Sequence, residues 1–282
     1  MLSRVFSEHV REQVEHFRFH PSQPPLLASF HDVVVICVVY FLSVRALKFF
    51  MRSRKPFDLR YVVAFHSGLL TVASFVLFAS FMMILFEKFQ SFSPWETICS
   101  SDFHHDGNLQ FLYYINYLVK WYELLDTVIL VLRKKEVIFL HEYHHAATLF
   151  LCWIQLDQHS TVQWVPITIN LLVHVFMYYY YTLAALKIPV WWKIYLTQLQ
   201  IVQFVIDIAA CKHLRMILLC SRPRPMCNGT LKGALVGVGV IFSYLVLFVI
   251  FYLQTVSIYA GWVERERERE RGGGGMGGGG GG

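Results

Sequence analysis

The amino-acid sequence predicts an all-α, polytopic membrane protein with seven transmembrane helices. Hydrophobic residues make up 56% of the 282 residues, and the mean hydropathy is +0.46. Only 16% of the residues are charged, and much of that charge lies in short clusters between long apolar runs. Each run has the roughly 20 residues that a helix needs to cross the hydrocarbon core of a bilayer. This pattern excludes an ordinary soluble domain.

The predicted helices follow one another along a single domain, residues 30–260. They cover residues 30–49, 61–86, 109–132, 137–157, 161–186, 191–212 and 233–259. Residues 1–29 carry no apolar signal-peptide segment, so we expect a luminal N-terminal segment and a first span that acts as the targeting anchor. Residues 264–271 alternate Glu and Arg, and residues 272–282 are Gly apart from Met276. We therefore expect residues 261–282 to form a low-complexity, disordered cytosolic tail.

The Lys and Arg residues of the loops predict the orientation in the membrane. The loop after the first span contains Arg52, Arg54, Lys55 and Arg60, and the loop after the third contains Arg133, Lys134 and Lys135. The loop after the second span contains Lys88 alone. Because cytoplasmic loops are enriched in Lys and Arg, we expect the N-terminus in the lumen and the C-terminus in the cytosol. Arg215, Arg222 and Arg224 in the sixth loop argue weakly for the opposite orientation.

Six cysteines in a chain of this length do not suggest a disulfide-rich scaffold. Under the predicted topology, however, Cys99 in the second loop and Cys220 and Cys227 in the sixth face an oxidising compartment. A single disulfide between Cys99 and Cys227 is therefore our hypothesis.

Three histidines in the fourth span are the most informative feature of the chain. His141, His144 and His145 share an arc of a helix about 100° wide. Imidazole groups are costly in hydrocarbon unless they are paired or reactive. We interpret them as reactive groups, against the alternative of three core histidines with satisfied hydrogen bonds.

Neighbouring spans carry three further polar groups. Lys120, Glu123 and Thr127 of the third span lie within an arc of about 60°, with Asp126 beside Glu123, and a structural ion-pair network is the alternative. The fifth span presents one polar face, made of Asn170, His174, Met177, Tyr178 and Tyr181. The sixth span contributes Thr197, Gln200, Gln203 and Asp207, the last three on one face. These residues could also be no more than hydrogen-bonding contacts between helices.

Counting residues from the loops places all four groups about 6–20 Å inside the same leaflet, at 1.5 Å per residue. We therefore predict that four helices converge on one polar chamber. Cations around its mouth would suit a phosphate-bearing ligand such as coenzyme A, although the general enrichment of cytosolic loops in cations also explains them. The candidates are Lys55, Arg60, Lys134, Lys135, Lys187 and Lys193.

These motifs resemble those of the fatty acid elongase (ELO) family of endoplasmic reticulum condensing enzymes, and most of all its fungal members. The pattern KxxExxDT is matched by Lys120, Glu123, Asp126 and Thr127, and HxxHH by His141, His144 and His145. The pattern NxxVHxxMYxYY is matched by Asn170, Val173, His174, Met177, Tyr178, Tyr180 and Tyr181. TxxQxxQ is matched by Thr197, Gln200 and Gln203, and KPFxLR by residues 55–60.

The resemblance implies the first step of fatty acid elongation. An acyl-CoA and malonyl-CoA would condense to 3-oxoacyl-CoA, CO2 and CoA, with no cofactor beyond these two substrates. Six of the seven helices would enclose a narrow acyl tunnel. An acyl-imidazole would form on His144, and His174 would assist. Histidine at position 141 resembles elongases of saturated and monounsaturated long or very-long chains.

The resemblance also implies roles for the site residues. The expected catalytic residues are His141, His144, His145, His174, Lys120, Glu123 and Asp126. The expected substrate-binding residues are Thr127, Asn170, Met177, Tyr178, Tyr181, Thr197, Gln200, Gln203, Lys55, Arg60, Lys187 and Lys193. The chemistry supports these roles, because an imidazole becomes an effective nucleophile when a second group orients it, here His141 or Asp126. His174, Asn170 and Tyr178 would donate hydrogen bonds to a developing enolate, and Lys120 would hold the malonyl or thioester end.

The expected partners are acyl-CoA, malonyl-CoA, membrane lipid and the other elongation enzymes, namely the ketoacyl reductase, the dehydratase and the enoyl reductase. We expect no nucleic acid, and a homodimer stays open. A membrane di-iron desaturase is the rival enzyme, but such enzymes use several histidine boxes. The nearest second box here, His104-His105, lies in the second loop across the membrane, so we expect no metal. A seven-helix receptor or transporter is the non-enzyme alternative.

Overall fold

The computed structural model describes residues 8–93, 96–220 and 230–273, and the regular elements of these residues are α-helices. Three helices, α2 (Phe30–Met51), α3 (Arg60–Ser91) and α9 (Trp164–Ala185), are long and apolar enough to cross a membrane, as is α11 from Leu231 to Ser257. A shorter apolar stretch, Tyr195–Cys211, lies within α10 (Lys193–Cys220). These helices indicate a multi-pass membrane protein.

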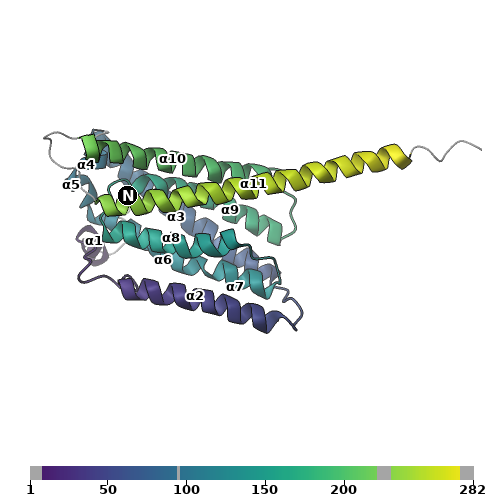
Figure 1. Cartoon of the computed structure of the whole chain (residues 1–282). Helices are drawn as coiled ribbons and strands as arrows, with labels where there is room; N and C mark the ends of the chain where they lie inside the picture. The colour runs from purple at the N-terminus through teal and green to yellow at the C-terminus, as the bar shows by residue number, and fades with distance from the viewer. Residues whose placement is uncertain (1–7, 94–95, 221–229, 274–282) are drawn as a thin grey trace, which may run out of the picture.

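The long helices run side by side in one bundle (Figure 1). The remaining long elements are α6 (Gly107–Glu123), α7 (Leu125–Leu132), α8 (Phe139–Asp157) and α11 (Leu231–Gly273). The most extensive packing is of α3 with α9, of α10 with α11 and α9, and of α6 with α8, while α2 packs against α7 and α8. Three short helices, α1 (Glu8–Glu15), α4 (Glu96–Cys99) and α5 (Ser101–His104), lie at one end.

The predicted third span is interrupted. Residues 109–132 form two helices that meet at Leu124, whose backbone N–H donates to the Trp121 carbonyl at 3.3 Å, three residues back. A tighter turn of this kind ends one helix and starts the next. The sequence gives no warning of it, because the position holds neither the Gly nor the Pro that usually marks a kink. Our expectation of one continuous helix there was wrong.

The last two helices extend beyond their predicted ends. Helix α10 continues to Cys220, and α11 continues to Gly273, so helix replaces the disorder that we expected for residues 261–273. Glu and Arg are both good helix formers, which favours the helix. Residues 274–282 lie outside the described residues.

The predicted disulfide is not tested. Cys227 and the side chain of Cys99 lie outside the described residues. Among the cysteines whose side chains are described, Cys37, Cys152 and Cys211 are free thiols.

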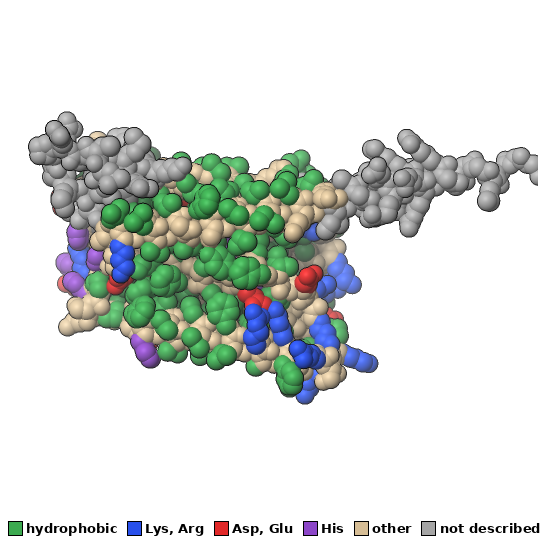
Figure 2. Space-filling view, in the orientation of Figure 1, with side chains coloured by type: hydrophobic (Ala, Val, Ile, Leu, Met, Phe, Trp, Pro, Cys, Tyr) green, Lys and Arg blue, Asp and Glu red, His purple; other side chains and the backbone are tan. Residues whose placement is uncertain are grey.

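The surface of the bundle has apolar flanks and a basic end. Figure 2 shows a face covered mostly by hydrophobic side chains, with Lys and Arg gathered toward the end from which α11 projects. The loops after α2, α7 and α9 lie at that end (Figure 1). Large side chains such as Phe65 and Phe86, 73% and 66% exposed, suit contact with hydrocarbon better than contact with water.

A capping box fixes the start of α2. The backbone N–H of Asp32 donates to Ser29 Oγ, and the Ser29 N–H donates to Asp32 Oδ2, both at 3.1 Å. The preceding segment is tied to the bundle because Trp153 Nε1 donates to the Ala28 carbonyl at 2.9 Å. The position of α2 is therefore set at its first residue.

We predict that Ser29→Ala lowers the free energy of unfolding by about 1 kcal/mol, because the Asp32 N–H loses its acceptor. Reversible unfolding of the purified protein in mixed micelles measures the change. Ser53→Ala, at an exposed serine after the same helix, serves as the control and should change stability by less. Equal effects of the two substitutions would show that the capping box contributes nothing.

Candidate functional site

A cavity of about 480 Å³ lies inside the bundle. Its lining comes from α3, α6, α7, α8, α9, α10 and α11, and none of the lining residues belongs to α2. Many residues expected in the site line it: Glu123, Asp126, His141, His144, His145, Asn170, His174, Met177, Tyr178, Tyr181, Lys193, Thr197, Gln200 and Gln203. Side chains from five helices, α6 to α10, thus meet in one place.

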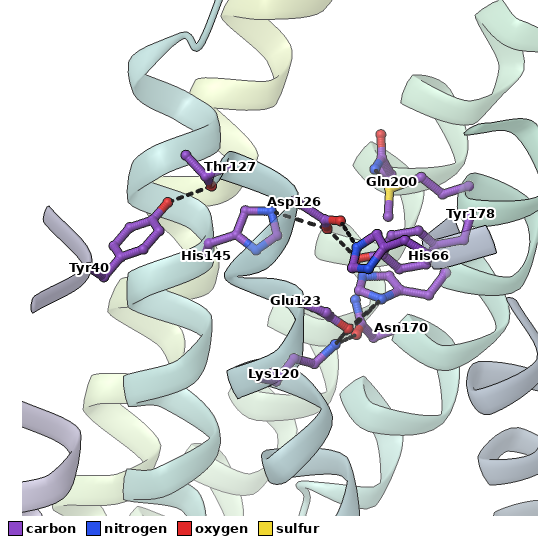
Figure 3. A network of polar contacts seen from close by, with 12 residues as sticks. Tyr40, His66, Lys120, Glu123, Asp126, Thr127, His145, Asn170, Tyr178 and Gln200 are labelled. Atoms are coloured by element: carbon purple, nitrogen blue, oxygen red, sulfur yellow. Dashed lines mark hydrogen bonds and ion pairs between the residues drawn. The ribbon is translucent and has the colours of Figure 1, made fainter. Parts of the chain in front are cut away.

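A buried ion cluster forms one wall of this cavity (Figure 3). Lys120 Nζ donates to Glu123 Oε1 at 2.8 Å and to Asn170 Oδ1 at 3.1 Å. Both partners of the ion pair are 2% exposed. His174 Nδ1 lies 3.2 Å from Glu123 Oε1 and 3.4 Å from Lys120 Nζ. The charges are therefore compensated within the cluster, as a buried charge requires.

A second carboxylate joins three other helices. Asp126 of α7 accepts a hydrogen bond from the Tyr178 hydroxyl of α9 at 2.7 Å. Oδ1 of Asp126 lies 2.6 Å from His66 Nε2 of α3, and Oδ2, which accepts from Tyr178, lies 3.9 Å from His145 Nε2 of α8. Figure 3 shows Asp126 between these side chains. An ionised carboxylate can accept several hydrogen bonds, so one residue orients groups from three directions.

His66 was missed by the sequence analysis. It is 5% exposed, and its Nδ1 lies 3.1 Å from the Tyr122 hydroxyl, opposite the contact with Asp126. The available signal was a single histidine inside an otherwise apolar predicted span. That signal is weak, because a lone buried histidine is common and its partners lie about 60 residues away in the sequence.

The three histidines of α8 lie together at the cavity. The ring centroids of His141 and His145 are 4.4 Å apart, and those of His144 and His145 are 5.8 Å apart. The His144 ring also packs against Tyr244 and Phe248 of α11, with centroids 4.8 and 5.8 Å away. The sequence analysis did not identify these aromatic residues, since they lie about 100 residues further along the chain.

A smaller cavity, about 80 Å³, adjoins the first. Both are lined by His144, Asn170, Gln203 and Phe204. From this junction the smaller cavity extends past Cys152 and Cys211 to Ser160 and Gly233, between α8, α9, α10 and α11. Its lining is predominantly apolar. The site therefore has a wide polar part and a narrow apolar part.

Among the expected site residues of the third predicted span, Thr127 and Lys120 do not line either cavity. Thr127 Oγ1 is hydrogen-bonded to the Tyr40 hydroxyl of α2 at 2.7 Å, on the far side of α7 in Figure 3. The interruption at Leu124 changes the helix register, so Thr127 does not share an arc with Lys120. Lys120 itself lies behind the cavity wall, where its ammonium contacts Glu123, Asn170 and His174.

The expected rim of cations is only partly at the cavity. Lys193 lines it, and so does Arg133, which the sequence analysis had not placed with the site residues. Lys55 and Lys187 are exposed and do not line it. Arg60 donates to the Leu186 carbonyl at 3.0 Å and thus joins the start of α3 to the loop after α9.

The acidic residue within the histidine motif points the other way. Glu142 is 4% exposed and accepts from Arg45 at 2.8 Å and from Lys48, both on α2. This contact fixes α2 against α8 through a side chain that does not line the cavity. Among the described residues, no group of three or more His, Cys, Asp or Glu side chains is arranged to hold a metal ion.

We predict that Lys120→Met destabilises the protein by about 3 kcal/mol, because it leaves Glu123 buried without its cation. Adding Glu123→Gln to Lys120→Met should recover part of that loss, since the uncompensated charge is then removed. Unfolding of the single and double variants in mixed micelles measures both effects. Lys232→Met, at an exposed lysine of α11, is the matched control and should change stability little. Additive effects of the two substitutions would contradict a direct pairing.

The sequence matches a known protein family over most of its length. Residues 25–259 match the ELO family, described as the GNS1/SUR4 family. The provisionally named fatty acid elongase 1 of Schizosaccharomyces pombe is 38% identical over 245 residues, which cover 85% of this chain and 73% of that protein. Fatty acid elongase A of Dictyostelium discoideum is 32% identical over 252 residues, covering 88% of this chain and 91% of that protein.

Very long chain fatty acid elongase 4 of Macaca mulatta is 32% identical over 248 residues, covering 82% of this chain and 73% of that protein. The matched range contains every residue that lines the two cavities. The chain therefore belongs to the ELO family of fatty acid elongases.

Proposed function

We propose that this protein catalyses the condensation step of fatty acid elongation, in which acyl-CoA and malonyl-CoA give 3-oxoacyl-CoA, CO2 and CoA. The observation that carries the proposal is the cavity in which His141, His144 and His145 of α8 lie with Asp126 of α7 and His174 of α9. Such a site offers a nucleophile, hydrogen-bond donors and an adjoining apolar cavity for an acyl chain. The two CoA esters are substrates, and the proposal needs no cofactor.

In the first half-reaction, a ring nitrogen of His144 attacks the thioester carbonyl carbon. The carbon–sulfur bond breaks, CoA leaves as the thiol with the proton lost by the imidazole, and an acyl-imidazole remains. The packing of His144 against Tyr244 and Phe248 supports this role, because it restricts the ring to one orientation. His144 also lines both cavities, so an acyl group on it can extend into the narrow one.

In the second half-reaction, malonyl-CoA loses CO2, and the resulting enolate carbon attacks the acyl carbon. The imidazole leaves and regains a proton, which gives 3-oxoacyl-CoA. Asn170 is suited to stabilise the enolate oxygen, because its Oδ1 accepts from Lys120 and its amide NH2 remains to donate. Glu123 contacts Nδ1 of His174 and so fixes the orientation of the ring. Nε2 of His174 is then left to contact the substrate. Lys120 thus acts by positioning these two residues.

The geometry supports a positioning role for Tyr178 as well. Its hydroxyl donates to Asp126, so its proton is directed away from an enolate in the cavity. Asp126 in turn faces His145 and His66. We propose that Asp126 orients the imidazole of His145, which lies next to His144, the nucleophile. His141 contacts the same His145 ring.

The substrates occupy the two parts of the site. Arg133 and Lys193 are placed to bind phosphate groups of coenzyme A at the mouth, with Lys55, Arg60 and Lys187 further out. Met177, Tyr181, Thr197 and Gln200 line the wide cavity beside the thioester, and Gln203 lies at the junction. The acyl chain, a saturated or monounsaturated long or very-long chain, enters the narrow cavity.

We further propose seven membrane spans, with α6 and α7 together forming one of them. Six spans surround the cavities and α2 packs outside, which agrees with the absence of α2 residues from their lining. Because the loops after α2, α7 and α9 lie at the basic end, we place that end in the cytosol and the N-terminus in the lumen. The membrane is that of the endoplasmic reticulum, where a ketoacyl reductase, a dehydratase and an enoyl reductase would complete the cycle.

We predict that His144→Ala reduces condensation at least about 1,000-fold, since the variant has no imidazole to accept the acyl group. Purified protein is given acyl-CoA and malonyl-CoA, and 3-oxoacyl-CoA is measured by mass spectrometry. With acyl-CoA alone, intact-mass analysis should detect an acyl adduct on the parent protein and none on the variant. His31→Ala, at an exposed histidine of α2, is the matched control. An unchanged rate for His144→Ala would exclude the acyl-imidazole.

The orientation has its own test. In sealed microsomes, a glycosylation site fused before residue 1 should be modified, whereas a tag fused after residue 282 should be cleaved by added protease. These outcomes follow from a luminal N-terminus and an odd number of spans. Modification or protection at both ends would contradict the seven-span proposal.

A further inference from the structure

Three buried polar atoms without a hydrogen-bond partner line the smaller cavity. They are Asn116 Oδ1, Gln163 Oε1 and Asp207 Oδ1. Their residues are only 2%, 6% and 1% exposed, and they come from α6, the start of α9 and α10. All three atoms are acceptors as placed, so this otherwise apolar cavity has acceptors in excess of donors.

Other polar groups around the cavity already have partners. The Thr148 hydroxyl is bonded to the Tyr244 hydroxyl at 3.0 Å, and Gln155 Nε2 donates to the Gly233 carbonyl at 3.0 Å. Gln203 Nε2 donates to Asp207 Oδ2 at 3.4 Å, which satisfies one oxygen of that carboxyl and leaves the other. The donor groups around this cavity are therefore bonded to other residues, and none of them bonds to these three acceptor atoms.

An unpaired acceptor in an apolar cavity costs free energy, and a plain hydrocarbon chain cannot relieve that cost. A hydroxyl group can, because it donates one hydrogen bond and accepts others. An oxo group or an epoxide only accepts, so it would add another unpaired acceptor to the cavity.

The position of these atoms sets where such a hydroxyl must lie. Asp207 is one helical turn beyond Gln203, which lines the junction with the wide cavity, a rise of about 6 Å. Gln163 is seven residues before Asn170, also at the junction, so it lies about 10 Å away along α9. The acceptors are thus several carbons along the chain from an acyl group on His144.

We propose that the smaller cavity binds a hydroxyl group carried part-way along the acyl chain, with Asp207 as the residue that determines this specificity. The inference builds on the proposed condensation and narrows its substrate class to hydroxyacyl-CoA. The hydroxyl donates to Asp207 Oδ1, and the amides of Asn116 and Gln163 lie around the same space.

The test compares acyl-CoAs of one chain length in the condensation assay with malonyl-CoA. One is unsubstituted, one carries a hydroxyl next to the thioester carbonyl, others carry it at successive positions along the chain, and one carries an oxo group mid-chain. We expect kcat/KM to be about tenfold higher for the mid-chain hydroxyl that reaches Asp207 than for the unsubstituted chain. The 2-hydroxy and oxo substrates should gain nothing.

Asp207→Leu should abolish this preference while condensation of the unsubstituted chain is retained. Asp207→Asn keeps the size of the side chain and a hydrogen-bonding oxygen, so it should retain part of the preference if the leucine variant folds poorly. Asp157→Asn, at a carboxylate that lines neither cavity, is the matched control.

The two proposals fail in different ways. If no acyl-CoA is condensed, the proposed function is wrong. If the unsubstituted chain is condensed and no hydroxyl position raises kcat/KM, or if the preference survives Asp207→Leu, water rather than substrate serves these acceptors and the inference is overturned.

Discussion

The cavity depends on two carboxylates, the buried Glu123 and the half-buried Asp126, placed on either side of the interruption at Leu124. Glu123 closes α6 and pairs with Lys120 and with His174 of α9. Asp126 opens α7 and contacts side chains of α3, α8 and α9. Charges in a membrane are tolerated where they are paired inside a bundle, so these two residues fix how the surrounding helices are oriented. The change of helix register between them directs one carboxylate to each set of partners.

The first long helix has a different task from the others. It lines neither cavity, and it is joined to the bundle by Tyr40 with Thr127, by Arg45 and Lys48 with Glu142, and by the capped segment before Phe30. Glu142, the acidic residue of the histidine motif, therefore joins α8 to α2. The histidines of α8 are kept facing the cavity because that helix cannot rotate without breaking the contact.

In the proposed reaction, the wide cavity holds the reacting groups and the narrow cavity recognises the acyl chain. The wide part holds the histidines, the carboxylates and the cations Arg133 and Lys193, which suit charged and reactive groups. The narrow part is predominantly apolar but contains three acceptors that lack donors. In a solvent-poor cavity such atoms influence which chain is bound, because each substrate either supplies a donor or leaves the acceptor unpaired.

The sequence by itself determined the class of the protein and most residues of the site. Long apolar runs predict helices because only helices satisfy the backbone within a membrane, and helical spacing predicted that His141, His144 and His145 share a face. It could not place Thr127 or Lys120, because the turn at Leu124 has no marker in the residues themselves. Nor could it find His66, Arg133, Tyr244 or Phe248 as neighbours of the site.

Only the tertiary structure decided which polar side chains face the cavity and which face another helix. Glu142 and His141 are adjacent in the sequence, yet one contacts α2 and the other lines the cavity. The same holds for Asp126 and Thr127 on α7. The physical reason is that spacing along a helix fixes the angle between side chains, whereas the partner at each angle is set by the packing of helices distant in the sequence.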